Sequence, residues 1–169
     1  MSDNTPKWTV GIDPGSDRSA WAIWSGERFE AHGIAPNERM VEELTAALYL
    51  SAANQTGRPE RVALVIEQVC CYGRPVGAEV FRTVWWSGVF KVRLGCSWPV
   101  CYVTKPQLCR WWLGKPGGTD AEIRGALIER YGKPGRSRKT PEGILWGIRA
   151  DEWLAAAHAI ALAEGIQTS

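Results

Sequence analysis

Three carboxylates stand where apolar segments of the sequence end or begin. Asp13 and Glu67 each close an apolar, strand-like segment, and Asp151 opens an alanine-rich segment near the end of the chain. An isolated anion at the end of a buried strand is costly to desolvate unless a cation pairs with it. Hard oxygen ligands suit Mg²⁺ or Mn²⁺, so converging carboxylates predict a divalent-metal site. The alternative is that each acid is an ordinary surface residue at the end of an element.

Such a site has a defined chemistry. Two metal ions about 4 Å apart, bridged by Asp13, could activate a water molecule and stabilise the leaving oxygen of a phosphodiester. That chemistry requires Asp13, Glu67 and Asp151 to meet at one point of the fold.

The periodicity of apolar residues predicts the elements that must position these acids. Strands are expected over 7–13, 19–24, 28–34, 62–67 and 99–103, and helices over 37–54, 77–93 and 149–164, with a further helix from the capping box at Thr119 to Gly132. The core order βββαβαβα predicts an α/β fold with a five-stranded mixed sheet and helices on both faces. The strands ending in Asp13 and Glu67 would be parallel neighbours, and ligands bind at such strand ends in open α/β sheets.

Length and composition favour one globular domain over residues 1–169. Apolar residues make up 45% and charged residues 22% of the chain, as in ordinary globular proteins, and no apolar run is long enough for a membrane span. The five cysteines have no metal-ligand spacing, so we expect reduced thiols and a cytoplasmic location. The net charge of +2 does not by itself indicate nucleic-acid binding. If the protein binds nucleic acid, local clusters of basic residues must contact the phosphates.

Several segments together resemble a known family. They are Gly11–Ser16, Ile66–Glu67, Tyr72–Thr83, Trp86–Phe90, Val103–Pro106, Gly117–Glu122 and the helix that begins at Asp151. The combination resembles the RuvC family of Holliday junction resolvases, which belongs to the RNase H-like (retroviral integrase) superfamily, and within it the phage-type branch. The resemblance implies a homodimeric, Mg²⁺-dependent endonuclease that nicks four-way or other branched DNA symmetrically, with Mn²⁺ able to substitute. It also implies a role in DNA recombination and repair inside a bacterium or phage-infected cell, without a membrane or a small-molecule cofactor.

The resemblance assigns roles to particular residues. Asp13, Glu67 and Asp151 match the metal-binding acids, and Lys105 matches a basic residue near the scissile phosphate. The family usually has a second acid, or a histidine, three residues from the last aspartate. Here the residues three positions from Asp151 are apolar. Either the adjacent Glu152 replaces the missing ligand, or the site has three carboxylates.

Other residues are candidates for contacts with DNA. Tyr72 and Arg74 follow Glu67, where an aromatic ring could stack on an unpaired base at the branch point, although Tyr72-Gly73 could equally be a simple turn. The basic residues Arg110, Lys115, Lys133, Arg136, Arg138 and Lys139 could contact phosphates along the DNA arms, or be ordinary solvated cations.

Two paired tryptophan motifs and one histidine have no role in this scheme. Neighbouring residues on a helix point about 100° apart, so one member of Trp85-Trp86 and of Trp111-Trp112 can pack while the other faces a partner. We interpret His158, two helical turns after Asp151, as a core or interface histidine.

Two other functions compete with the nuclease. The turn Gly11–Gly15 also resembles the phosphate loop of actin-like ATPases, but the chain lacks a second such loop and is too short for their two domains. A noncatalytic protein that binds branched DNA is the other alternative, because the fourth acid is missing. Metal-dependent cleavage of a four-way junction distinguishes it from a nuclease.

Overall fold

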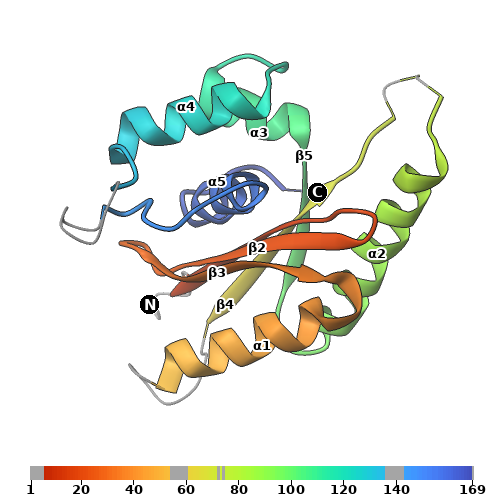
Figure 1. The fold of residues 1–169 in the computed structure, drawn as a ribbon, viewed down its shortest axis with the longest axis horizontal. Coiled ribbons are helices and arrows are strands. Elements are labelled where there is room, and N and C mark those ends of the chain that lie inside the picture. Colours follow the sequence, from red (N-terminus) through yellow and green to blue (C-terminus); the bar gives the residue numbers. More distant parts are fainter. Residues whose placement is uncertain (1–5, 54–60, 72, 74, 136–142, 169) are drawn as a thin grey trace.

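Five strands form one mixed sheet in the order β3-β2-β1-β4-β5 (Figure 1). The computed structural model describes residues 6–53, 61–71, 73, 75–135 and 143–168. The strands are β1 (Trp8–Asp13), β2 (Arg18–Trp24), β3 (Phe29–Pro36), β4 (Val62–Gln68) and β5 (Val100–Thr104). The helices are α1 (Asn37–Ala53), α2 (Ala78–Gly95), α3 (Lys105–Leu113), α4 (Asp120–Tyr131) and α5 (Glu152–Ala163). β1 pairs antiparallel with β2 and parallel with β4.

The expected α/β fold is confirmed, with helices on both faces of a mixed sheet. Two helices stand between β5 and α5, and the sequence predicted bounds only for the second, α4. The bounds of α3 follow from a capping box in which the Thr104 side chain accepts from the Gln107 backbone N–H while the Gln107 side chain accepts from the Thr104 N–H. α5 begins at Glu152, later than predicted, because Ala150 adopts a left-handed backbone with φ 45°.

The sheet separates two apolar cores. On one face, α1 and α2 contribute Met40, Leu44 and Phe90 to a core that also contains Val10 and Ile12 of β1. On the other face lies a second core, built largely from α3, α4 and α5 (Figure 1). Because side chains alternate along a strand, each residue of β1 and β4 can be assigned to one of these two faces.

α5 packs directly on the backbone of β1. A Cβ atom added to Gly11 would lie 1.9 Å from the Ala155 carbonyl oxygen and 2.6 Å from the Ala159 nitrogen. Only glycine leaves room for this approach. The Thr9 hydroxyl also donates a 2.7 Å hydrogen bond to the Ala159 carbonyl, which fixes the helix along the strand.

α5 is almost entirely buried, yet it spans only 12 residues. Within the described parts of the chain, no helix combines the length and apolar character needed to cross a membrane.

Candidate active site

Asp13 and Glu67 lie side by side at the carboxyl ends of two parallel strands. Ile12 of β1 is in register with Ile66 of β4, so the next residue of each strand is one of the two acids. Asp13 shares its face with Thr9 and Gly11, which contact α5. Glu67 shares its face with Val65, which belongs to the same core as α5. Both carboxylates therefore lie on the α5 side of the sheet.

Asp151 reaches the same region from the start of α5. It is the exposed residue that immediately precedes the helix, and its side chain makes no capping hydrogen bond. The charges of Glu67 and Asp151 both act on Asp13. Asp13 keeps some exposed surface, but the surrounding protein desolvates it and raises its pKa well above 3.8, and the charges of Glu67 and Asp151 raise it further. The structure thus places the three predicted acids at the same end of the sheet, and their role as metal ligands stays a prediction.

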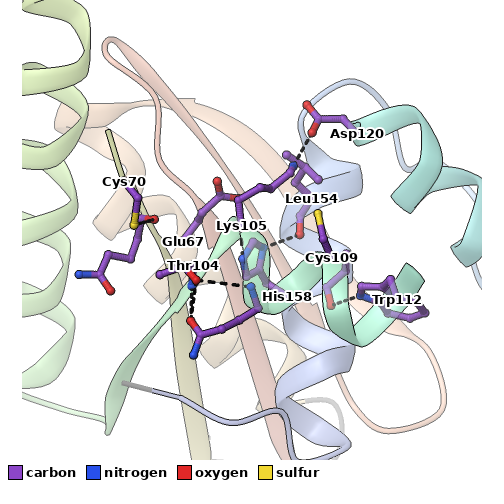
Figure 2. A network of polar contacts seen from close by, with 12 residues as sticks. Glu67, Cys70, Thr104, Lys105, Cys109, Trp112, Asp120, Leu154 and His158 are labelled. Carbon is purple, nitrogen blue, oxygen red and sulfur yellow. Dashed lines mark hydrogen bonds and ion pairs between the residues drawn. The ribbon is translucent and has the colours of Figure 1, made fainter. Parts of the chain in front are cut away.

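Lys105 lies beside these acids as the first residue of α3, directly after β5. Its positive charge lowers the pKa of Asp13, in opposition to the carboxylates. Figure 2 shows its ammonium group reaching toward α4, where it forms an ion pair with Asp120.

Asp120 is an acid of this region that the sequence analysis did not assign to the site. It is the first residue of α4, and its charge also raises the pKa of Asp13. Together with Asp151 and Arg124 it lines a cavity of about 290 Å³ between α4 and the start of α5. The capping box identified Asp120 as a helix start, but no sequence signal showed that this helix end faces the acids.

A buried polar network holds the turn that follows Asp13. The Asn37 amide donates to the Gly15 carbonyl at 2.9 Å and accepts from the Ser19 hydroxyl at 2.7 Å. Ser19 in turn accepts from the Gly15 N–H at 3.2 Å. Ser19 and Asn37 are both fully buried, so this network fixes the turn against the first residue of α1.

Glu152 is engaged away from the three acids. Its carboxylate is buried, lies 3.0 Å from Nδ1 of His32 on β3, and accepts a 2.9 Å hydrogen bond from the Arg149 N–H. Of the two possibilities left open by the sequence, this geometry favours a three-carboxylate site over Glu152 as a ligand. Glu152 instead fixes the turn that precedes α5.

His158 is a core histidine, as interpreted from the sequence, but it also faces Glu67. Its Nδ1 donates to the Leu154 carbonyl at 2.9 Å, and its Nε2 lies 3.7 Å from Oε2 of Glu67 (Figure 2). Burial lowers the pKa of His158 below 6.5, while the charge of Glu67 opposes that shift.

The predicted DNA-binding residues are only partly described. Tyr72, Arg74, Arg136, Arg138 and Lys139 lie outside the described residues. Arg110, Lys115 and Lys133 are exposed. Lys115 donates to Glu122 at 2.7 Å, and Arg110 lines a cavity of about 450 Å³ beside Trp111.

The tryptophan pairs divide as their helical spacing predicts. Trp85 is 60% exposed while Trp86 stacks on Phe90. Trp111 is partly exposed while Trp112 donates to the Ala157 carbonyl of α5 at 3.3 Å.

The donor chemistry of the site fits a hard divalent cation. Asp13, Glu67 and Asp151 offer only carboxylate oxygens, and the charges of Glu67 and Asp151 disfavour ionisation of Asp13. Among the described residues, however, no three His, Cys, Asp or Glu side chains stand close enough to hold a metal ion. The three acids would therefore have to converge further to enclose one.

Of the comparisons with known proteins, only the one with solved structures found matches. No protein-family model and no curated protein matches the sequence. Among solved structures, RuvC from Thermus thermophilus matches with a TM-score of 0.58 and 16% identity, over 96% of this chain and 99% of that chain. This chain has the RuvC fold. T. thermophilus RuvC in complex with a Holliday junction substrate matches with a TM-score of 0.54 and 17% identity, over 95% of this chain and 93% of that chain. At such identities the likeness to RuvC establishes the fold, and the phage-type branch stays a prediction.

Proposed function

We propose that this chain is a metal-dependent endonuclease that cuts branched DNA, with the four-way junction as its principal substrate. The observation that carries the proposal is that Asp13 and Glu67 follow paired residues of β1 and β4, with Asp151 at the start of α5 near enough for its charge to act on Asp13. Partly buried carboxylates that repel one another are stabilised by a cation. The RuvC fold supports the proposal, because one of the matching RuvC structures holds a Holliday junction.

Each residue of the site has a role in this proposal. Asp13, Glu67 and Asp151 would hold Mg²⁺, or Mn²⁺ in its place, and the metal would supply an activated water and charge stabilisation at the phosphodiester. Lys105 would contact the scissile phosphate, and its ion pair with Asp120 keeps the ammonium group beside the acids. The turn held by Asn37 would keep Asp13 oriented toward the metal.

DNA would extend from this edge over basic surfaces. Tyr72 and Arg74 would contact the branch point, while Arg110, Lys115, Lys133, Arg136, Arg138 and Lys139 would contact phosphates. Lys115 would exchange Glu122 for a phosphate, which is feasible because both side chains of that ion pair are well exposed.

Symmetric cutting of a four-way junction requires two sites, so the proposal includes a homodimer. One face of α2 supports this part of the proposal. Phe81, Trp85 and Val92 on α2 are exposed by 60% or more, and a hollow of about 500 Å³ runs past Gly88 between Trp85 and Val92. A second copy of α2 would cover this apolar face.

The test is cleavage of labelled four-way, three-way and linear DNA with Mg²⁺ or with a chelator. Wild-type protein should cut the four-way junction only with Mg²⁺. Asp13→Asn, Glu67→Gln and Asp151→Asn should each abolish cutting and leave junction binding intact or tighter, since each removes a ligand and an anion that repels phosphate. Asp17→Asn is the matched control, because Asp17 is an exposed acid paired with Arg82. Cutting by any one of the three variants would remove that residue from the site.

The missing fourth acid supports a second candidate, a noncatalytic protein that binds branched DNA. Among the described residues no ready-made cluster of metal ligands exists, which is the observation in its favour. Tight junction binding without cutting in either Mg²⁺ or Mn²⁺ would establish this second function and exclude the first.

A further inference from the structure

We propose that His158 is a positioning residue that fixes the carboxylate of Glu67 in the active site. The inference rests on the proposed function in one respect, that Glu67 is a metal ligand. It assigns a role to a histidine two helical turns beyond Asp151.

The first observation is that two polar atoms face each other without other partners. Among the described residues, Oε2 of Glu67 and Nε2 of His158 are two of the four buried side-chain nitrogen or oxygen atoms that have no hydrogen-bond partner. They lie 3.7 Å apart. Buried polar atoms are rarely left unpaired, so their mutual approach calls for an explanation.

The second observation is that the orientation of the imidazole ring is fixed. Nδ1 donates to the Leu154 carbonyl at 2.9 Å, in the preceding turn of the same helix. That hydrogen bond commits the Nδ1 edge to the helix and leaves the Nε2 edge for Glu67 (Figure 2). Metal-ligating groups are commonly oriented in this way by a buried partner behind them.

The third observation concerns the surroundings of the ring. His158 is fully buried, and the charged group that its free ring edge faces is the Glu67 carboxylate. A hydrogen bond between Nε2 and Oε2 would pair these two atoms and restrain the Glu67 side chain. The opposite oxygen of Glu67 is then left for the site that it shares with Asp13.

The consequence for the fold is that α5 serves the site twice. Asp151 immediately precedes its first turn, and its second turn brings His158 beside Glu67. The helix packs on β1 at Gly11 and Thr9. This packing fixes the positions of Asp151 and His158 relative to the strand that carries Asp13.

The experiment measures Mn²⁺ binding without DNA, by the electron paramagnetic resonance signal of free Mn²⁺. His158→Phe fills the volume but removes the polar edge, and it should raise the Mn²⁺ concentration for half-saturation by about 10-fold, the usual effect of losing a partner behind a metal ligand. His158→Gln keeps a side-chain N–H donor and should recover most of the affinity. Trp21→Phe is the matched control, because it removes another buried, unpaired ring N–H from the core on the opposite face of the sheet, and its Mn²⁺ affinity should equal that of wild type.

A second readout is the side-chain carboxyl ¹³C resonance of Glu67, assigned by its loss in Glu67→Gln. It should move in His158→Leu, which removes the polar ring edge, and stay in place in Trp21→Phe. This readout also decides the matter if His158→Phe does not fold. An unmoved Glu67 resonance, or a folded His158→Phe protein with wild-type Mn²⁺ affinity, would overturn the proposal.

The failure of the proposed function gives a different pattern. Wild-type protein that binds Mn²⁺ but cuts no junction would refute the nuclease and leave the role of His158 standing. If wild-type protein binds no Mn²⁺, the metal site is refuted. The shift of the Glu67 carboxyl resonance then shows by itself whether His158 positions that carboxylate.

Discussion

Asp13 lies where protein surroundings and neighbouring charges both disfavour its ionised form. Desolvation is the largest cause of the raised pKa of Asp13, and the negative charges of Glu67 and Asp151 are the next largest. The folded protein therefore binds a proton at Asp13 more tightly than the unfolded chain does. By linkage, the stability of the metal-free protein falls as pH rises from about 3.9, the ordinary aspartate value, through the raised pKa, and stays reduced above it.

Asp13→Asn should therefore raise the melting temperature of the metal-free protein. The gain should be largest at neutral pH and shrink as the pH is lowered toward 4, where the wild-type carboxyl is protonated in both states. Thermal unfolding with a chelator between pH 4 and pH 8 measures this, with Asp17→Asn as a control that shows no gain. A gain independent of pH, or a loss of stability, would contradict the electrostatic account of Asp13.

Glu152 illustrates how neighbouring residues of one turn can serve different purposes. Its carboxylate is bonded to His32 and to the Arg149 N–H, while Asp151 stays exposed at the start of α5. The Mg²⁺ requirement should therefore not depend on the charge of Glu152.

Glu152→Gln should leave the Mg²⁺ concentration for half-maximal single-turnover cutting unchanged, because the amide oxygen can still accept from the Arg149 N–H. Glu152→Ala should destabilise the protein by about 1–3 kcal/mol, since the His32 ring and the Arg149 N–H both lose their acceptor. Denaturant unfolding and a Mg²⁺ titration measure the two effects separately. A raised Mg²⁺ requirement in Glu152→Gln would restore Glu152 as a ligand.

At the scale of elements, the site depends on how closely α5 packs against β1. The backbone of α5 occupies the space that any side chain at position 11 would need. Helix capping is a second determinant, because the capping box at Thr104 starts α3 directly at Lys105 and keeps that residue beside the strand ends.

Gly11→Ala should lower the free energy of unfolding by about 3 kcal/mol or more, because the added methyl group overlaps the Ala155 carbonyl and must displace α5. Gly125→Ala is the matched control. Position 125 lies within α4 with no atom near the added methyl group, so alanine should stabilise the protein by about 1 kcal/mol. Urea unfolding of both variants gives the comparison, and similar values for the two would contradict the packing argument.

At the scale of the whole molecule, the described surface has one helix face that is strongly apolar. Phe81, Val84, Trp85 and Val92 lie at helical spacing along α2 and are all well exposed. A nuclease that nicks opposite strands of a junction needs a second active site, and pairing through this face would provide it.

Trp85→Ser should convert the protein to a monomer, because it removes a large apolar side chain from the centre of this face. Light scattering after size exclusion measures the mass. The monomer should bind Mn²⁺ normally and produce single rather than paired nicks in a cruciform plasmid. Leu50→Ser removes a similarly exposed apolar residue from α1 and should leave the oligomeric state unchanged. A Trp85→Ser protein with wild-type mass would place the interface elsewhere.

The sequence by itself determined the strands, most helices and the position of Asp13 and Glu67 at strand ends, because these depend on local patterns. Alternating apolar residues define strands and their faces, and a carboxylate directly after such a run lies at a strand end wherever the strand is placed. The parallel pairing of β1 and β4 then follows from the order of elements.

Only the tertiary structure decided which other groups reach those acids. Local periodicity assigns a residue to a face of its own element, but the distance between two elements depends on side-chain packing far apart in the sequence. Asp120 comes near Asp13 because α4 packs with its first turn toward the strand ends. The Glu152 carboxylate does not join the three acids because it pairs with His32 of β3. His158 meets Glu67 because Gly11 lets α5 lie directly on β1, and no pattern within α5 specifies that contact.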